Sequence, residues 1–128
     1  MEFFSIRQDG EKTDGTNIHH VQPKLMKNML EKLIERESRP ANVGPRVTAI
    51  RMTVKLSKAE FADAVGVDRS SLTKIERGDA GLDIAVGERI AVIFGFGLDF
   101  IYRGELSDVP LSQRDALMVN LLNAKYPQ

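Results

Sequence analysis

Residues 57–78, SKAEFADAVGVDRSSLTKIERG, decide the fold of this 128-residue chain. Ser57 followed by Glu60 three residues later is the pattern of a capping box, which predicts the start of a helix. The apolar residues that follow at helical spacing are Phe61, Ala62 and Val65. Gly66 comes next, and glycine readily adopts the left-handed conformation that ends a helix. This half of the segment therefore predicts a short amphipathic helix that ends in a tight turn.

A second short helix is predicted directly after the turn. Asp68 is a good N-cap, and Leu72 and Ile75 lie three residues apart, so they share the inward face. Gly78 then closes the unit. The polar side chains left on the outside are Arg69, Ser70, Thr73, Lys74 and Arg77. Two short helices joined by a glycine turn, with a polar outer face on the second, are the layout of a helix-turn-helix.

The segment resembles the Cro/C1-type family of phage and bacterial repressors, also called the XRE family. The resemblance extends over about residues 46–104. The stretches that carry it are Ala49-Ile50-Arg51, Leu56-Ser57, Ala62 with Gly66, Leu72, Ile75-Glu76-Arg77-Gly78, then Ile84, Ile90, Ala91, Phe94, Gly95, and finally Leu98, Asp99, Ile101, Tyr102, Arg103 and Gly104. It implies an all-α, five-helix lambda-repressor-like DNA-binding domain, in which residues 68–77 form the recognition helix.

The resemblance also implies roles for individual residues. The positions that match base-reading places are Arg69, Ser70, Thr73 and Lys74. An arginine can bind guanine O6 and N7 with two hydrogen bonds, whereas hydroxyl groups discriminate less between bases. The expected phosphate contacts are Lys55, Lys58, Ser71 and Arg77. Arg51 and Glu76 are expected to form a buried ion pair with a structural role.

The remaining sequence predicts extensions on both sides of this domain. We expect a polar N-terminal arm over residues 1–22 and an amphipathic helix over residues 23–37. Its apolar stripe consists of Leu25, Met26, Met29, Leu30, Leu33 and Ile34. Residues 38–45, with two prolines and a glycine, indicate a linker before a helix that begins at Arg46. Residues 105–128 are expected to form a C-terminal helical extension, capped by Ser112.

The composition of the chain excludes several classes of function. The chain has no cysteine, which excludes thiol catalysis and cysteine-ligated zinc. No stretch is long and apolar enough to cross a membrane, and the start, MEFFSIRQDGEK, is charged where a signal peptide is apolar. We therefore expect a cytoplasmic protein without a membrane partner. His19-His20 has no third ligand at useful spacing, and no catalytic grouping stands out, so no metal, no cofactor and no enzyme activity is expected.

The predicted function is a sequence-specific transcriptional regulator, in particular a repressor that binds double-stranded DNA at an operator as a homodimer. The sequence leaves the dimer surface open among the 23–37 stripe, the last helix, and the aromatic residues Phe96, Phe100 and Tyr102. Two alternatives also stay open. One is the antitoxin of a toxin–antitoxin pair, which would hold a protein partner through residues 23–37. The other is a protein-interaction module without DNA binding, favoured by the zero net charge and by Asp79, which repels phosphate.

Overall fold

The computed structural model describes residues 22–127, with the side chains of residues 33–35 left aside. Its helices are α1 (Pro23–Ser38), α2 (Pro40–Thr53), α3 (Lys58–Val65), α4 (Arg69–Arg77), α5 (Ile84–Phe94), α6 (Leu98–Arg103) and α7 (Leu111–Lys125). No strand occurs among the residues described. The all-α class predicted from the sequence is therefore confirmed. The chain divides into two compact units, residues 1–32 and residues 33–128.

Helix α1 forms where the sequence predicts an amphipathic helix. Pro23 is its first residue, a position at which the missing N–H of proline costs no hydrogen bond. Lys27 and Glu31 form an i, i+4 ion pair on its exposed side. The apolar side chains of Leu25, Met29 and Leu30 are exposed, each by about half. This part of the predicted stripe thus remains on the surface.

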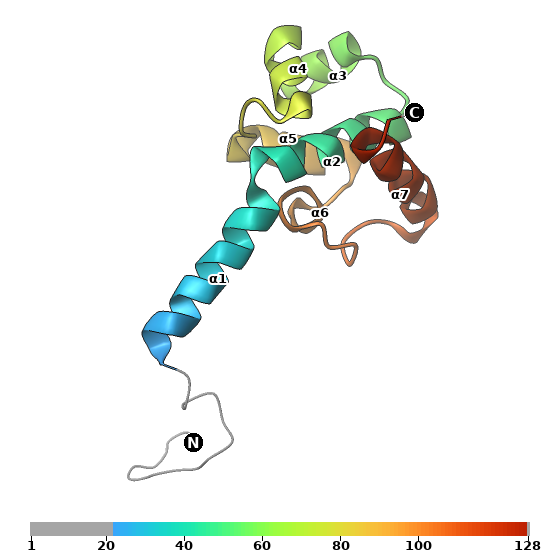
Figure 1. The fold of residues 1–128 in the computed structure, drawn as a ribbon. Coiled ribbons are helices and arrows are strands. Elements are labelled where there is room, and N and C mark those ends of the chain that lie inside the picture. The colour runs from blue at the N-terminus through green and yellow to red at the C-terminus, as the bar shows by residue number, and fades with distance from the viewer. Residues whose placement is uncertain (1–21, 128) are drawn as a thin grey trace. The chain divides into compact units, whose positions relative to one another are not determined.

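Helix α2 is the centre of the unit formed by residues 33–128. It contacts α4, α6 and α7, and Figure 1 shows α3 and α4 on one side of it and α6 on the other. Four of its apolar residues are 0–2% exposed: Val43, Val47, Ala49 and Ile50. Phe61, Leu72, Ile90 and Phe100 join the same core from four other helices. The burial of these side chains provides the main driving force that holds the domain together.

The linker predicted over residues 38–45 is wrong, because α2 begins at Pro40 rather than at Arg46. Pro40 suits the first helical position, but Gly44 and Pro45 both lower helix propensity. Tertiary packing overrides that propensity. A Cβ atom built on Gly44 would lie 2.6 Å from the carbonyl oxygen of Ile75 and 2.7 Å from that of Glu76. Glycine at this position therefore lets the end of α4 pack directly against the backbone of α2.

Helix α7 lies along α2 and closes the core on that side (Figure 1). Leu117 and Leu121 are buried, and the Nδ2 of Asn120 donates a hydrogen bond of 2.9 Å to the Oγ1 of Thr53 on α2. The expectation that Ser112 caps this helix is wrong. Pro110 occupies the N-cap position, since its fixed φ leads the chain directly into the helix at Leu111. The C-terminal extension is thus part of the folded domain.

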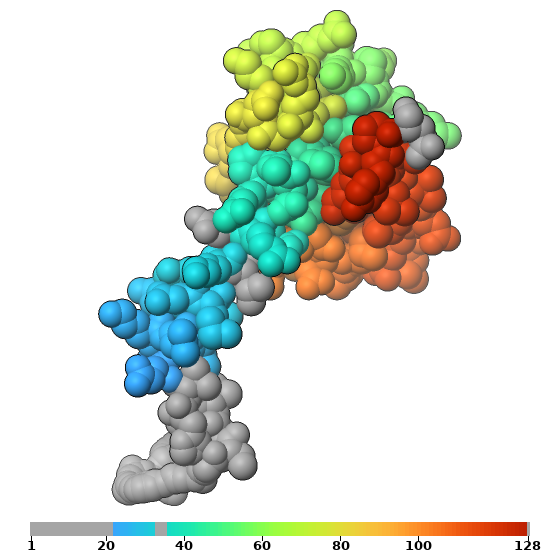
Figure 2. All heavy atoms as spheres, in the orientation of Figure 1, coloured from blue at the N-terminus to red at the C-terminus, as the bar shows by residue number. Residues whose placement is uncertain are grey.

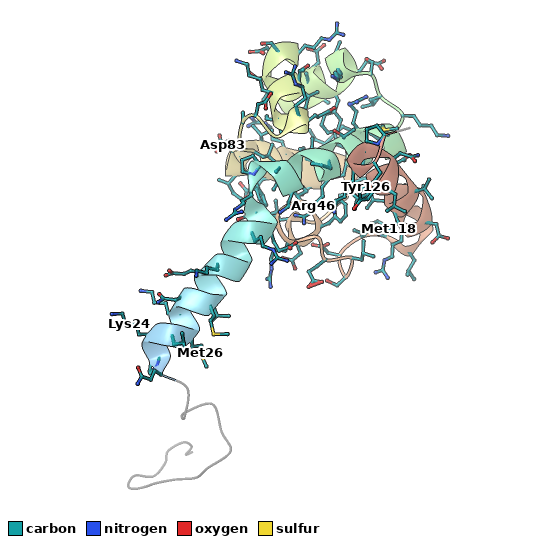
Figure 3. All side chains as sticks on the ribbon, in the orientation of Figure 1. Lys24, Met26, Arg46, Asp83, Met118 and Tyr126 are labelled. Atoms are coloured by element: carbon teal, nitrogen blue, oxygen red, sulfur yellow. The ribbon has the colours of Figure 1, made fainter. Side chains whose placement is uncertain are left out.

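Two further sets of residues are buried in this unit. Arg46 is 3% exposed, and its guanidinium donates hydrogen bonds to the backbone oxygens of Glu37 and Ile101 and pairs with the Glu37 carboxylate at 2.9 Å. Figure 3 labels Arg46 on α2. Phe96 and Phe100 are 1% and 0% exposed. Among the dimer surfaces that the sequence left open, the one formed by Phe96 and Phe100 is therefore wrong, because the core already holds both rings.

Candidate DNA-binding interface

Helix α3 begins with the capping box expected from the sequence. The Ser57 hydroxyl accepts a hydrogen bond from the Glu60 backbone N–H at 3.1 Å, and the Glu60 carboxylate accepts one from the Ser57 N–H at 2.9 Å. The hydrogen bond from the Ser57 backbone lowers the pKa of the Glu60 carboxyl below its ordinary value. These bonds satisfy N–H groups that the first turn of a helix leaves unpaired, so they fix where α3 starts.

The turn between α3 and α4 is built around Gly66. Its φ of +77° lies in the left-handed region, which costs glycine nothing and strains a residue with a Cβ. The N–H of Val67 donates to the carbonyl oxygen of Ala62 at 3.0 Å, as in a Schellman motif. Arg89 on α5 donates a hydrogen bond of 2.7 Å from its Nε to the carbonyl oxygen of Val65. The last turn of α3 is therefore held by α5 as well as by its own backbone.

Helix α4 starts at a side-chain cap. Oδ1 of Asp68 accepts hydrogen bonds from the Ser71 backbone N–H and from the Ser70 hydroxyl, both at 2.7 Å. The bond from the Ser71 backbone, followed by the bond from the Ser70 hydroxyl, lowers the pKa of Asp68. Because the Ser70 proton is engaged in this way, its hydroxyl presents acceptor lone pairs outward rather than a donor.

The inner side of α4 is fastened to the domain at several points. Leu72 and Ile75 are 1% and 6% exposed. Glu76 receives two hydrogen bonds from Arg51 on α2, Nε to Oε2 at 2.7 Å and Nη2 to Oε1 at 3.0 Å. Arg51 also donates to the carbonyl oxygen of Leu56, just before α3. The structure thus contains the largely buried ion pair that the family resemblance implied, and this pair ties α4 to α2 and to the entrance of α3.

The outer side of α4 carries the residues expected to read bases. Arg69, Ser70 and Lys74 are exposed and Thr73 is half-buried. Together with Arg77 they line one shallow hollow on the surface. Within residues 22–127, neither Arg69 nor Lys74 makes a hydrogen bond or an ion pair. Figure 2 shows α3 and α4 at one end of the unit formed by residues 33–128. The two cations are therefore free to contact a ligand.

The residues expected to contact phosphate occupy three places. Lys55 and Lys58 lie before and at the start of α3, on either side of the Ser57 cap; Lys55 is exposed and has a φ of +62°. Ser71 is half-buried, and its backbone N–H is engaged by Asp68. Arg77 pairs with Asp79 through its Nε at 3.4 Å. An anion at Arg77 must compete with this exposed carboxylate.

Two supporting residues could not be identified from the sequence. Gly44 permits the close approach of α2 and α4, and Arg89 holds the end of α3. Both contacts join residues far apart in the chain, so no local sequence pattern predicts them.

The described residues contain no group of three or more histidine, cysteine, aspartate or glutamate side chains placed to hold a metal ion. His19 and His20 lie outside the described residues. None of the helices described is both long enough and apolar enough to span a membrane.

Comparison with known proteins identifies the domain. Residues 47–101 match the family model described as helix-turn-helix, a range that begins within α2 and ends within α6. Neither the search of curated proteins nor the search of solved structures returned a match. The helix-turn-helix family is a DNA-binding regulator family and is not typically enzymatic. Residues 47–101 are therefore a helix-turn-helix domain of the Cro/C1-type, or XRE, family.

Proposed function

We propose that the chain is a sequence-specific transcriptional regulator, a repressor that binds an operator as a homodimer through α4. One observation carries the proposal: Arg69 and Lys74 project unpaired from the outer face of α4, while the inner face of the same helix is fixed to the domain. A rigid helix with free cations on its exposed side suits the major groove of DNA.

In the proposed complex, Arg69 reads guanine and Lys74 reaches guanine or a phosphate. Ser70, whose proton is bonded to Asp68, accepts a hydrogen bond from a base amino group or from a bridging water. Thr73 lies between these residues and adds a weaker contact. The DNA phosphates are contacted by four residues beside these positions: Lys55, Lys58, Ser71 and Arg77. Phosphate contacts fix the register of the protein, and base contacts select the sequence.

The direct test is selection of bound fragments from a random pool of duplex DNA by the full chain. We expect an enriched sequence with two inverted half-sites, about one helical turn apart. Binding to that sequence should weaken with salt, and the slope of log affinity against log salt should be about −0.9 for each phosphate contacted. Failure to enrich any sequence, together with an affinity independent of salt, would instead favour a protein-interaction module.

The phosphate contact proposed for Lys58 can be tested against a matched control variant. Lys58→Ala should weaken binding to selected and random sequences by the same factor, because a phosphate contact carries no base information. Arg103→Ala removes one exposed cation from α6 and should leave both affinities unchanged. A loss confined to the selected sequence would contradict the role proposed for Lys58.

One observation favours the antitoxin as a second candidate function. Leu25, Met29 and Leu30 on α1 are each about half exposed, which suits an apolar protein partner. The test is co-expression of the chain with the gene beside it, followed by purification. A partner that co-purifies with the native chain and is lost with Leu30→Asp would support the antitoxin; recovery of the chain alone would count against it.

A further inference from the structure

Helix α7 carries an apolar stripe on the side opposite its buried residues. Leu117 and Leu121 face α2, whereas the exposed fractions on the outer side are 79% for Leu111, 57% for Val119, 55% for Leu122 and 67% for Tyr126. Met118 is 36% exposed and lies in the same stripe. Figure 3 shows Met118 on α7 and Tyr126 at its C-terminal end, and Figure 2 shows the helix at the surface.

These residues form one continuous face because of their spacing. From Leu111 to Tyr126, each member has another three or four residues away once Asp115 is counted between Leu111 and Met118, and Met118 and Val119 lie side by side. The face is about 22 Å long, from 15 steps of 1.5 Å. The exposed apolar residues of α5 make no such face: Val92 is 83% exposed, but Glu88 and Arg89 are its neighbours one turn earlier. The α7 stripe is thus suited to protein contact.

The stripe is complementary to itself about position 120. Met118 and Leu122 lie two residues on either side of that position, and Asp115 and Lys125 lie five residues on either side. In an antiparallel pair of α7 helices related by a two-fold axis, Met118 of each copy therefore meets Leu122 of the other. Asp115 likewise comes opposite Lys125, which attracts it. Within the part of the chain that the structure describes, neither Asp115 nor Lys125 has an ion-pair partner.

We propose that the outer face of α7 binds the same face of a second copy of this chain, antiparallel and centred near Asn120. This inference rests on the proposed function, which requires two copies on one operator, and it names the surface that joins them. The core of the contact is apolar, from Met118, Val119 and Leu122. The two Asp115–Lys125 pairs at its ends set the orientation, since a parallel arrangement would place like charges together.

The first experiment measures the dimer without DNA, by sedimentation equilibrium of the full chain. Leu122→Asp should raise the dimer dissociation constant about 100-fold, because each dimer then buries two carboxylates in an apolar contact. Val92→Asp adds the same charge at an exposed valine on α5, and Leu30→Asp adds it on α1. Both variants should dimerise as the native chain does. Circular dichroism verifies that all three variants keep the native helix content.

The second experiment tests the orientation by exchanging charges. Asp115→Lys gives a protomer with two cations at these positions, and Lys125→Asp gives one with two anions. Each variant alone should dimerise more weakly than the native chain, and this result sets the orientation, because a parallel native pair would already place like charges together. A mixture should form heterodimers about 10-fold tighter than either homodimer, because both pairs are then of opposite sign.

Three results would overturn the inference: a native chain that stays monomeric, a dimer insensitive to Leu122→Asp or equally sensitive to Val92→Asp or Leu30→Asp, or a mixture with no preference for heterodimers. The proposed function is judged separately, by DNA selection. A chain that dimerises through α7 but selects no DNA would refute the regulator and leave the dimer contact standing. A chain that selects DNA, and whose Leu122→Asp variant still dimerises, would refute the α7 contact and leave the regulator standing.

Discussion

The two sides of helix α4 differ in how their charged groups are used. On the inner side, Glu76 is 5% exposed at its side chain and bound by two nitrogens of Arg51. On the outer side, Arg69 and Lys74 are exposed and, within residues 22–127, have no protein partner. The inner charges are committed to the fold, and the outer charges are available for a ligand. The helix thus separates a structural side from a side free for recognition.

This difference teaches that the position of a charge on the helix decides its role more than its identity does. A buried ion pair gives little net stability, but removing one partner leaves an uncompensated buried charge. An exposed cation contributes almost nothing to stability and can be desolvated by a ligand. The two sides should consequently respond to different measurements: unfolding for the inner side and DNA binding for the outer side.

The largest expected effect comes from breaking the inner side. Arg51→Ala should lower the free energy of unfolding by about 3–5 kcal/mol, because Glu76 is left buried without its partner. Urea unfolding followed by circular dichroism measures the loss. Arg51→Met combined with Glu76→Leu should recover most of it. Lys74→Ala, on the outer side, should change stability by less than about 0.5 kcal/mol. Equal losses in Arg51→Ala and Lys74→Ala would refute the division between the two sides.

The next effect concerns the outer side. Arg69→Ala should cost about 1–3 kcal/mol of binding free energy at the selected operator and relax the sequence preference at one position in each half-site. Its free energy of unfolding should match that of the native chain. Fluorescence anisotropy with operator duplexes mutated at single positions measures both affinity and preference, and Arg103→Ala on α6 is the control. An unchanged footprint in Arg69→Ala would show that the assigned register of α4 is wrong.

Local chemistry made most of the helix-turn-helix predictable from the sequence. The capping box at Ser57, the left-handed Gly66 and the Asp68 cap each depend on residues within four positions of one another. The outer face of α4 follows from the helical spacing of Leu72 and Ile75. Short-range hydrogen bonds and helical periodicity depend only on residues close together in the sequence, so they can be recognised without knowledge of tertiary contacts.

The start of α2 could not be predicted, because tertiary contacts decide it. Two prolines and a glycine within residues 38–45 indicate a linker by propensity. In the fold, the lack of a Cβ at Gly44 admits the end of α4, and two nitrogens of the buried Arg46 are bound by Glu37 and by the backbone of Ile101. The contacts of Gly44 with Ile75 and of Arg46 with Ile101, which span 31 and 55 positions, outweigh the local cost of Pro45. The burial of Phe96 and Phe100 has the same origin, since their partners lie on distant helices.

A smaller effect tests the C-terminal end of the outer side of α4, where Arg77 pairs with Asp79. Both side chains are mostly exposed, so Asp79→Asn should leave stability within about 0.5 kcal/mol. It frees Arg77 and removes a carboxylate from the loop beside the site. Binding to random duplex DNA should tighten a few-fold, and the salt slope should steepen by about 0.9 if Arg77 then contacts a phosphate.

The matched control for Asp79→Asn is Asp99→Asn, which removes an exposed carboxylate from α6. Filter binding over a range of salt concentrations compares the two variants with the native chain. An equal change in both would indicate an effect of net charge alone, and no change in Asp79→Asn would exclude Arg77 as a phosphate contact in the variant.

The smallest effect is a pH dependence at the start of α4. The pKa of Asp68 is lowered in the folded chain, chiefly by the Ser71 backbone N–H, so ionised Asp68 stabilises the fold. That contribution is fully present above the pKa of the unfolded chain, about 4, and is lost as the pH falls through the lower pKa of the folded state.

Asp68→Asn keeps a good cap but cannot titrate. Thermal unfolding measured from about pH 6, where Asp68 is ionised in both states, down to about pH 2.5 should therefore show a shallower decline for Asp68→Asn than for the native chain. Asp63→Asn, which removes an exposed charge from α3 without touching a cap, controls for net charge. Parallel declines in the native chain and Asp68→Asn would mean that the hydrogen bonds of this carboxylate do not stabilise the first turn of α4.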